Sequence, residues 1–280
     1  MNRRIRRLSW RLGRRLYCAA RGEPNPNLPM RNGEIDLARR VVSSAPSGSP
    51  LIVIDVGANV GDWIRPVLDA LPAHRLDTSR TRFFAFEPAP QTRGLLVENI
   101  AAHARSALVT IEHRALSNER GEAQMMTFGA EAGTHTLGVG THACGSASEA
   151  VTVEVTTLAE FAGEQGLGHI DLVKIDTEGF DRLVLEGMQP LLAEERISVA
   201  QFEYNHRWVA TRSFFKDVFD MVEGLPYSVA RLMPDHVEVI EQWHPEVERF
   251  FEANYAVVRH ADLPRLDARR GCFDGSNTYA

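Results

Sequence analysis

The segment Ile52–Gly61 (IVIDVGANVG) constrains the fold more than any other part of the chain. Its apolar start predicts a strand that is buried on both faces. Asp55 and small residues follow, and then a helical pattern begins. Glycines at 57 and 61 allow a tight turn and a close approach of the backbone to a ligand, and the N-terminus of the next helix offers free N–H groups. The segment therefore predicts a strand–turn–helix unit with a ligand beside the turn.

Short β-rich runs and helical patterns alternate along the rest of the chain. Strands are expected at 51–56, 82–87, 108–114, 121–128, 150–156, 170–176, 197–204, 227–232, 236–241 and 254–260. Helices are expected at 34–45, 60–71, 90–104, 157–166, 180–193 and 211–223. This alternation predicts a doubly wound, mostly parallel α/β sheet with helices on both faces. Ligands of such sheets bind at the carboxyl ends of the strands, so functional residues are expected there.

The charge of the chain is distributed unevenly. Eight of its 31 basic residues and none of its 37 acidic residues lie in residues 1–22, so the remainder carries a net charge of about −14. An acidic body repels phosphate backbones, which argues against a nucleic-acid partner. At 100° per residue, Ile5, Leu8, Leu12 and Leu16 share one arc of a helix, and Arg3, Arg7, Arg11 and Arg14 fall on the opposite side. This basic amphipathic helix either attaches to an anionic membrane surface or an acidic partner, or is a solvated, frayed terminus.

The sequence divides into four expected parts. These are the basic helix (1–22), a proline-rich linker (23–30), the main domain (31–262) and a C-terminal tail (263–280). Three cysteines, at positions 18, 144 and 272, lie far apart, without a disulfide or zinc-binding pattern. A secretory signal and an apolar run of about 18 residues are both missing. We therefore expect a cytoplasmic protein, with peripheral contact to the inner face of the membrane through the basic helix as an open alternative.

The turn after the first strand indicates what kind of ligand it binds. Its spacing departs from the G-x-G-x-x-G pattern of dinucleotide-binding turns because Asn59 stands at the middle position. Asp55 would repel a pyrophosphate but attract a ligand that carries an ammonium group and a sulfonium centre. Glu87, at the end of the second strand, stands where a carboxylate binds the ribose of a nucleoside. These residues favour a sulfonium nucleoside over NAD, and an NAD-dependent oxidoreductase is the alternative.

A second group of polar residues follows two later strands. Lys174 and Asp176 alternate onto one face of a buried strand, and Glu178 continues that face if the chain stays extended. Glu203 and Asn205 share a face at the end of the next strand. The oxygens of Asp176, Glu203 and Asn205 suit Mg²⁺. A salt-bridged network that orients the substrate without a metal is the equal alternative.

A hydroxyl that attacks a methyl group must lose its proton, so a general base is expected near these residues. The candidates are His135, His142, Lys174, Glu178 and His206. His135 and His142 lie in a glycine-rich stretch, residues 129–145, that is either a lid over the substrate or a surface loop.

Five motifs, in order and spacing, resemble those of the FkbM family of methyltransferases. They are VIDVGANVGDW, FAFEP, ALSNERGE (115–122), DLVKIDTEGFDRLVLEG and AQFEYN, and the K-I-D-x-E-G element is the family-specific part. The resemblance covers roughly residues 50 to 205. It implies a seven-stranded sheet with an antiparallel last strand, S-adenosylmethionine as cofactor, and O-methylation of a sugar, glycan, glycolipid or similar natural product. By position, the cofactor loop corresponds to Asp55, Gly57, Asn59 and Gly61, the ribose ligand to Glu87, and the acidic pair to Asp176 and Glu178.

Three sets of site residues result. The cofactor-binding set is Asp55, Gly57, Ala58, Asn59, Gly61, Glu87, Pro88 and Ala115. The catalytic set is Lys174, Asp176, Glu178 and His206, and the Mg²⁺-binding set is Asp176, Glu203 and Asn205. The expected partner is a small-molecule or glycan acceptor and not a nucleic acid. A catalytically silent binding protein on the same fold is the remaining alternative.

Overall fold

The computed structural model describes residues 2–23, 31–45, 49–72, 79–127, 136–137 and 149–271. The lid candidates His135 and His142 lie outside these ranges, as do Cys144, Cys272 and most of the predicted linker.

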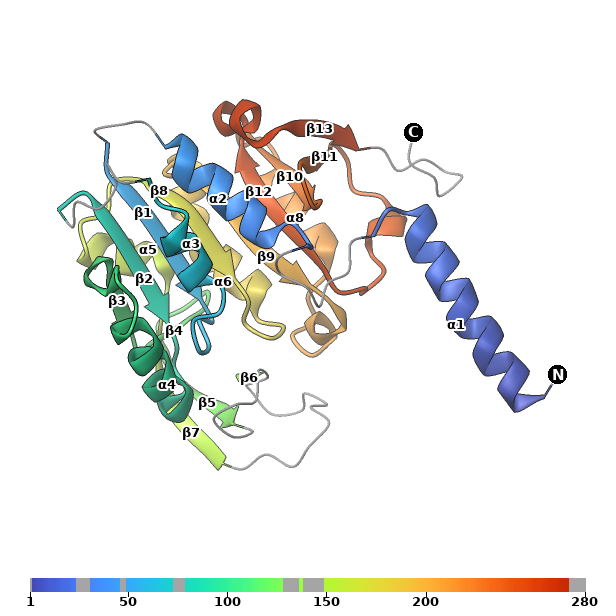
Figure 1. Cartoon of the computed structure of the whole chain (residues 1–280), viewed down its shortest axis with the longest axis horizontal. Helices are drawn as coiled ribbons and strands as arrows, with labels where there is room; N and C mark the ends of the chain where they lie inside the picture. The colour runs from blue at the N-terminus through green and yellow to red at the C-terminus, as the bar shows by residue number, and fades with distance from the viewer. Residues whose placement is uncertain are drawn as a thin grey trace.

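Nine strands of the described chain form one sheet, in the order β13-β11-β10-β12-β9-β8-β1-β2-β3 (Figure 1). The strands are β1 (Leu51–Val56), β2 (Thr81–Phe86), β3 (Val109–Glu112), β8 (Ile170–Ile175), β9 (Ile197–Tyr204), β10 (Tyr227–Leu232), β11 (Val237–Ile240), β12 (Ala253–Arg259) and β13 (Ala268–Gly271). β3, β2, β1, β8 and β9 run parallel, whereas β12 lies antiparallel between β9 and β10. Seven of the strands thus confirm the predicted mostly parallel sheet with its antiparallel last strand.

Two further strands, β11 and β13, extend the sheet beyond these seven. β11 corresponds to the strand expected at 236–241 and pairs antiparallel with β10. β13 lies within the segment expected to be a tail and pairs parallel with β11, from Val237 opposite Ala268 to Ile240 opposite Gly271. This pairing covers the edge of β11, which would otherwise expose its backbone N–H and C=O groups.

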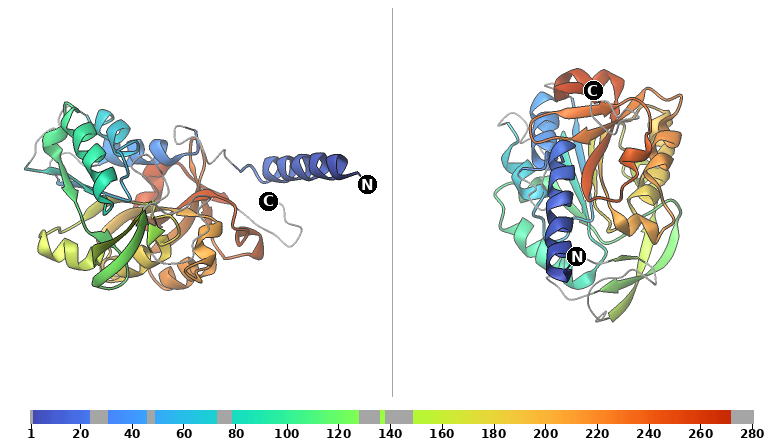
Figure 2. Two further views of the ribbon diagram at one scale, coloured as in Figure 1. Left: turned by 90° about the horizontal axis from the view of Figure 1, so that it is seen from below. Right: turned by 90° about the vertical axis from the view of Figure 1, so that its right-hand side faces the viewer.

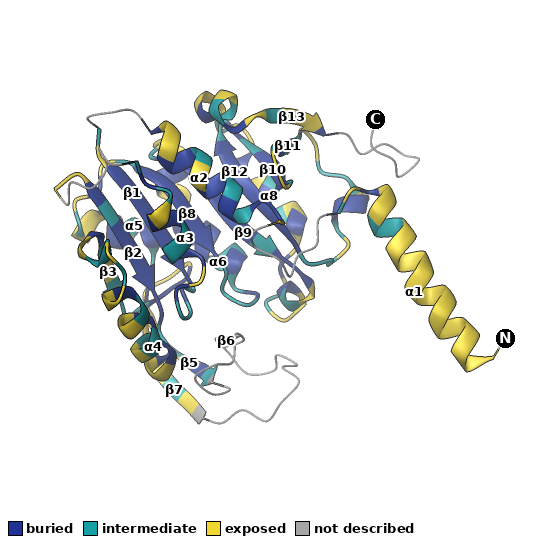
Figure 3. Cartoon of the chain, in the orientation of Figure 1, coloured by how far each residue is buried: buried dark blue, intermediate teal, exposed yellow. Residues whose placement is uncertain are grey.

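Helices cover both faces of the sheet because side chains alternate along each strand. Leu51 and Val53 pack with α2 (Glu34–Ser44), α3 (Ile64–Asp69) and α4 (Pro90–Ala101). Ile52 and Ile54 face the opposite layer, which holds α5 (Leu158–Glu164), α6 (Asp181–Gly187), α7 (Gln189–Ala193) and α8 (Phe215–Val222). The strands between these layers are almost wholly buried (Figure 3). The predicted doubly wound fold is therefore confirmed.

The largest departures from the predicted helix bounds have local reasons. The helix expected at 60–71 begins only at Ile64, because the turn continues through Gly61, whose φ is 90°. The helix expected at 180–193 is divided in two, since Pro190 lacks an N–H group and stands in the first turn of a new helix. The helix expected at 211–223 begins at Phe215, where the side chain of Asp217 accepts the N–H of Phe214 at 2.9 Å.

A smaller sheet lies beside the main one, in the order β4-β7-β5-β6. Its strands are β4 (Ala115–Leu116), β5 (Gly121–Thr127), β6 (Thr136–Leu137) and β7 (Glu149–Thr156). The strands predicted at 121–128 and 150–156 therefore pair with each other, outside the main sheet. Short 3-10 helices complete the connections: η2 (Ser106–Leu108), η3 (His206–Val209), η4 (Pro245–Val247) and η5 (His260–Leu266).

The basic N-terminal segment forms a single helix, α1 (Arg3–Ala20), which projects away from the sheet and its covering helices (Figure 2). None of its residues is buried. No helix within the described ranges is long and apolar enough to cross a membrane.

Candidate active site

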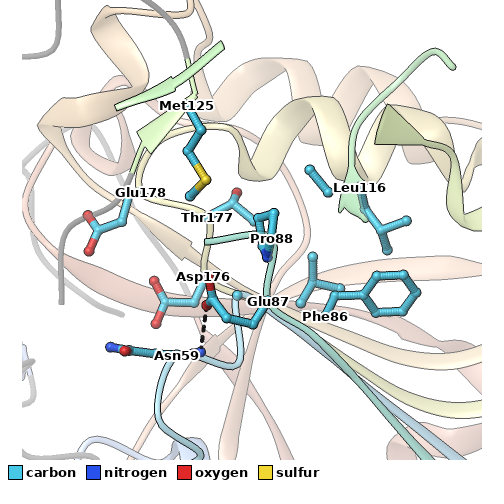
Figure 4. A pocket seen from close by; sticks show the side chains of 12 residues that line it. Asn59, Phe86, Glu87, Pro88, Leu116, Met125, Asp176, Thr177 and Glu178 are labelled. Carbon is cyan, nitrogen blue, oxygen red and sulfur yellow. Dashed lines mark hydrogen bonds between the residues drawn. The ribbon is translucent and has the colours of Figure 1, made fainter. Parts of the chain in front are cut away.

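A pocket of about 630 Å³ opens at the carboxyl ends of β1, β2 and β8, the edge where functional residues were expected (Figure 4). The predicted site residues that line it are Gly57, Asn59, Glu87, Pro88, Ala115, Asp176 and Glu178. The rest of the lining consists of Val56, Phe86, Leu116, Met125 and Thr177. The predicted residues outside the lining are Asp55, Ala58, Gly61, Lys174, Glu203, Asn205 and His206.

Backbone contacts shape the turn after β1. The N–H groups of Gly57 and Ala58 both donate to the carbonyl oxygen of Phe86, at 3.0 and 2.9 Å. Gly57 has a φ of 78°, and a Cβ atom there would lie 2.0 Å from the carbonyl oxygen of Asp176. Only glycine fits this position. Asn59 is also left-handed, with a φ of 48°, a conformation that asparagine adopts more readily than most residues.

Glu87 joins this turn to the end of β2. Its Oε2 accepts the N–H of Asn59 at 3.0 Å, and its Oε1 accepts the N–H of Ala89 at 2.9 Å. Burial raises the pKa of Glu87 to about 7, although these two N–H groups favour the carboxylate and oppose the shift. The side chain thus stands in the pocket wall at the position predicted for a ribose ligand, and its role there stays a prediction.

Lys174 is a buried cation beneath the pocket. Its Nζ lies 3.4 Å from Oδ1 of Asp55 and 3.3 Å from Oδ2 of Asp176. Burial alone would lower the pKa of Lys174, but the carboxylates of Asp176, Asp55 and Glu34 outweigh it and raise that pKa. Lys174 therefore stays protonated at neutral pH, which suits a counter-ion better than a general base. Within the described chain, neither carboxylate oxygen of Asp55 accepts a hydrogen bond.

Glu178 lines the pocket from the turn after β8. Its φ of 58° shows that the backbone leaves the extended conformation here, so it does not continue the face of Lys174 and Asp176 as an extended strand would. Its Oε2 lies 2.9 Å from a guanidinium nitrogen of Arg207. Burial and the nearby carboxylate of Asp176 raise the pKa of Glu178 to about 8, although Arg207 opposes the shift. This carboxyl group can therefore exchange a proton near neutral pH.

Of the predicted metal ligands, Asp176 and Glu203 lie close enough for the carboxylate of one to affect the pKa of the other. Burial and the carboxylate of Asp176 raise the pKa of Glu203 well above its usual range. Oδ1 of Asn205 accepts the backbone N–H of Arg207 at 2.7 Å and so caps η3. No group of three or more His, Cys, Asp or Glu side chains that could hold a metal occurs in the part of the chain that the structure describes. His206 is exposed at the start of η3 and does not line the pocket.

Sequence reasoning missed several charged residues around the pocket. Glu34, at the start of α2, accepts hydrogen bonds from the amides of Asn32 and Asn254, the latter at 2.7 Å, and burial raises its pKa to about 7. Asp181 accepts the N–H of Gly179 at 3.2 Å, and burial raises its pKa to about 7. Asp181 lies in the DLVKIDTEGFDRLVLEG motif, two residues after the K-I-D-x-E-G element, so the motif could have indicated it. No local pattern connects Glu34 with β8.

Carboxyl groups outnumber basic groups among the described residues around the pocket. A cation in the pocket would favour the ionised forms of these carboxyl groups, whose pKa values burial raises, whereas a pyrophosphate would disfavour them. Apolar side chains, among them Phe86, Leu116 and Met125, form other parts of the wall. The pocket therefore suits a ligand that combines a positive centre with a flat, largely apolar ring.

Several solved methyltransferase structures are similar to this chain. An FkbM methyltransferase structure from Methylobacillus flagellatus KT is 10% identical over 78% of this chain, with a TM-score of 0.45, and the chain spans 47% of that protein's length. Magnesium protoporphyrin IX methyltransferase from Synechocystis PCC 6803, solved with bound S-adenosylmethionine, is 12% identical over 80% of this chain and 77% of its own, with a TM-score of 0.41. An rRNA methylase from Streptococcus thermophilus is 12% identical over 80% of this chain and 93% of its own, with a TM-score of 0.42.

No curated protein matches the chain. The model of the family described as "Methyltransferase FkbM domain" matches residues 55–229, more than half of the chain, and takes in the turn after β1, Glu87 and the acidic turn after β8. The chain therefore belongs to the FkbM family and is an S-adenosylmethionine-dependent methyltransferase of the class I fold.

Proposed function

We propose that this protein transfers the methyl group of S-adenosylmethionine to a hydroxyl group of a sugar, glycan, glycolipid or similar natural product. The observation that carries the proposal is the pocket in which a glycine-shaped turn and Glu87 stand on one side and Asp176 and Glu178 on the other (Figure 4). When bound, S-adenosylmethionine supplies an activated methyl group on a sulfonium cation. The chain itself supplies charge, orientation and a place for the acceptor's proton.

The cofactor side of the pocket fits this ligand. Glu87 keeps its carboxyl group at the wall, where it can accept hydrogen bonds from ribose hydroxyls. Asp55 lies behind this wall, where burial raises the pKa of its carboxyl group and Lys174, 3.4 Å away, opposes the shift. Phe86, Pro88 and Leu116 offer apolar surface to an adenine ring.

The acceptor side of the pocket offers a general base. Of the base candidates that the structure describes, only Glu178 lines the pocket. Its pKa of about 8 lies close to working pH, so a useful fraction of the group is ionised and can take up a proton from an acceptor hydroxyl. Much of the remaining rate enhancement would come from alignment of the hydroxyl with the methyl group.

We further propose that the acidic group orients the acceptor without a metal ion. Asp176 is paired with Lys174, Glu178 is paired with Arg207, and the side-chain oxygen of Asn205 already accepts the backbone N–H of Arg207 in η3. A magnesium ion on Asp176, Glu203 and Asn205 would share the side-chain oxygen of Asn205 with that N–H group and would compete with Lys174 for Asp176. The magnesium site remains the competing prediction, and chelation decides between the two.

The acceptor is proposed to be other than a nucleic acid, because the body of the protein is acidic and repels phosphate backbones. RNA nevertheless belongs among the acceptors to be tested, since one structural relative is an rRNA methylase. A cytoplasmic location stays a prediction that rests on the cysteine pattern.

The function is tested by incubating the full chain with methyl-labelled S-adenosylmethionine and separate pools of glycans, glycolipids, small metabolites and RNA. We expect label in a carbohydrate-containing pool and none with Glu178→Gln. Label in RNA alone would overturn the proposed acceptor class. Binding of S-adenosylhomocysteine without labelling of any pool would favour the catalytically silent alternative. A thermal shift with NAD but not with S-adenosylhomocysteine would contradict the cofactor.

A further inference from the structure

Exposed apolar surface is concentrated in α1. Eight large hydrophobic side chains of the described residues are exposed, and five of them belong to this one helix: Ile5, Leu8, Trp10, Leu12 and Leu16. Leu8, Leu12 and Leu16 are 65%, 59% and 62% exposed. A protein in water alone gains nothing from such a surface, so its concentration in one helix marks an interaction site.

The two faces of α1 have opposite chemistry. Ile5, Leu8, Leu12 and Leu16 fall within one arc of the helix. Around the rest of the helix stand seven arginines, and α1 contains no acidic residue. Helices of this composition lie in the interface of anionic membranes, with their apolar side chains among the acyl chains and their cations at the headgroups.

The C-terminal end of α1 is fastened to the body. The hydroxyl of Tyr17 donates to Glu246 at 2.6 Å, and Arg21, only 4% exposed, lies 3.2 Å from the same carboxylate. Arg231 of β10 in turn donates to the carbonyl oxygen of Arg21 at 3.0 Å. The ring of Tyr17 also meets that of Phe251 edge to face, with centroids 5.8 Å apart. The C-terminal end of the helix is therefore the fixed base of a projecting arm.

This base lies at the same edge of the sheet as the pocket. Glu246 and Phe251 belong to the connection that enters β12. The first residue of β12, Ala253, pairs with Tyr204, the last residue of β9. The carboxyl end of β9 is the edge at which the pocket opens, and Glu252 is close enough to influence the pKa of Glu178. When α1 binds a partner, the edge of the sheet that holds the pocket therefore lies nearer to that partner than the opposite edge does.

We propose that α1 binds the surface of an anionic phospholipid membrane and holds the pocket edge of the sheet at that surface. Charge complementarity selects an anionic partner, because α1 is wholly basic whereas the rest of the chain is acidic. The exposed apolar arc favours a lipid surface over a nucleic acid, since the charged outer surface of a nucleic acid has no continuous apolar region to receive Leu8 and Leu12 together. The body, with its negative charge, stays on the water side.

The test is flotation of the full chain with vesicles of phosphatidylcholine alone and of phosphatidylcholine mixed with phosphatidylglycerol. We expect binding only to the anionic vesicles, weakening as salt rises, and a loss of at least about tenfold for Leu8→Ser/Leu12→Ser. This double variant keeps the charge of α1 unchanged. Val97→Ser, which removes an exposed apolar side chain from α4, is the matched control and should bind like the wild type.

Equal binding to both kinds of vesicle, or unchanged binding of Leu8→Ser/Leu12→Ser, would overturn the proposal. A parallel titration with an RNA oligonucleotide tests nucleic acid as the partner of the basic helix. If Arg7→Ser/Arg11→Ser abolishes RNA binding and Leu8→Ser/Leu12→Ser leaves it intact, α1 binds nucleic acid instead of a membrane. The thermal shift with S-adenosylhomocysteine, recorded for every variant, should equal that of the wild type. It separates failure of the arm from failure of the methyltransferase site.

Discussion

The turn after β1 and the turn after β8 border the same pocket but are built in different ways (Figure 4). In the first turn, glycine conformations and backbone hydrogen bonds decide the shape, and Gly57 touches the carbonyl of Asp176 so closely that no side chain fits between the two turns. In the second turn, charged side chains determine the shape of the backbone. Asp181 accepts hydrogen bonds from backbone N–H groups, and Glu178 is paired with Arg207.

This difference separates the two tasks that a methyltransferase must perform. A turn fixed by its backbone presents one rigid surface, as recognition of a single invariant cofactor requires. A turn held by ionisable groups, with pKa values near neutral, can move protons and adapt to an acceptor. Changes in the first turn should therefore act on cofactor binding, and changes in the second on turnover and its pH dependence.

Glu178→Gln should produce the largest effect, a fall in kcat of roughly 1000-fold, because it removes the proposed general base while keeping the shape of the side chain. The Kd for S-adenosylhomocysteine should change little. Glu119→Gln, at an exposed glutamate away from the second turn, is the control. Comparable losses of kcat and of cofactor affinity would show that the two turns do not divide the tasks.

The same base predicts the pH profile. A general base acts only when deprotonated, so kcat should rise with pH and level off above about 8. Below that value it should fall about tenfold per pH unit. The rise of kcat with pH should be missing in Glu178→Gln. If the rise persists in this variant, a group other than Glu178 is the titrating base.

Gly57→Ala should come next, with a loss of S-adenosylhomocysteine affinity of about 100-fold and of folding stability of about 3 kcal/mol. The added Cβ would overlap the carbonyl of Asp176 and sit on a left-handed backbone. Calorimetry and urea unfolding measure the two effects. Gly94→Ala, in the open face of α4 with no atom near the new Cβ, should be neutral or slightly stabilising. Wild-type affinity in Gly57→Ala would refute the rigid-turn account.

Glu87→Gln should weaken S-adenosylhomocysteine binding about tenfold, since a charge-assisted acceptor becomes a neutral one. The exposed Glu98→Gln on α4 should leave binding unchanged. An unchanged affinity in Glu87→Gln, measured by calorimetry, would mean that this carboxyl group only supports the turn through Asn59 and Ala89.

Removal of divalent metal should have the smallest effect. With the second turn held by ion pairs and by the Asn205 cap, we expect kcat to be the same before and after treatment with a chelator. Loss of activity that Mg²⁺ or Mn²⁺ restores would instead support the site on Asp176, Glu203 and Asn205.

The sequence predicted those features that depend on neighbouring residues. Buried strands such as Leu51–Val56 are recognised by their nearly continuous runs of apolar residues. The position of Glu87 follows from the end of the strand that precedes it. Contacts between distant segments could not be predicted in this way. The pairing of Arg207 with Glu178 depends on the position of η3 beside the turn after β8. Met125 lines the pocket because β5 belongs to the smaller sheet and not to the main one.

The roles of Asp55 and Lys174 also depend on a contact between distant segments. From the sequence, Asp55 is expected to attract the ligand beside the first turn, and Lys174 to share a strand face with Asp176. The register of β1 with β8 places Asp55 beside Lys174, and their mutual pairing below the pocket becomes visible only when the two strands are aligned. Asp55 still contributes to cofactor binding in our prediction, but through charge and through Lys174 rather than through a wall contact.

The excess of carboxyl groups around the pocket also bears on product release. Methyl transfer removes the sulfonium charge of the ligand and leaves its ammonium group, so the attraction to these carboxyl groups is weaker afterwards than before. The product should therefore leave more readily than the donor, without a separate opening step to expel it. Inhibition by accumulated S-adenosylhomocysteine should accordingly be weak, and the enzyme should keep working where the donor is only modestly in excess of its spent form.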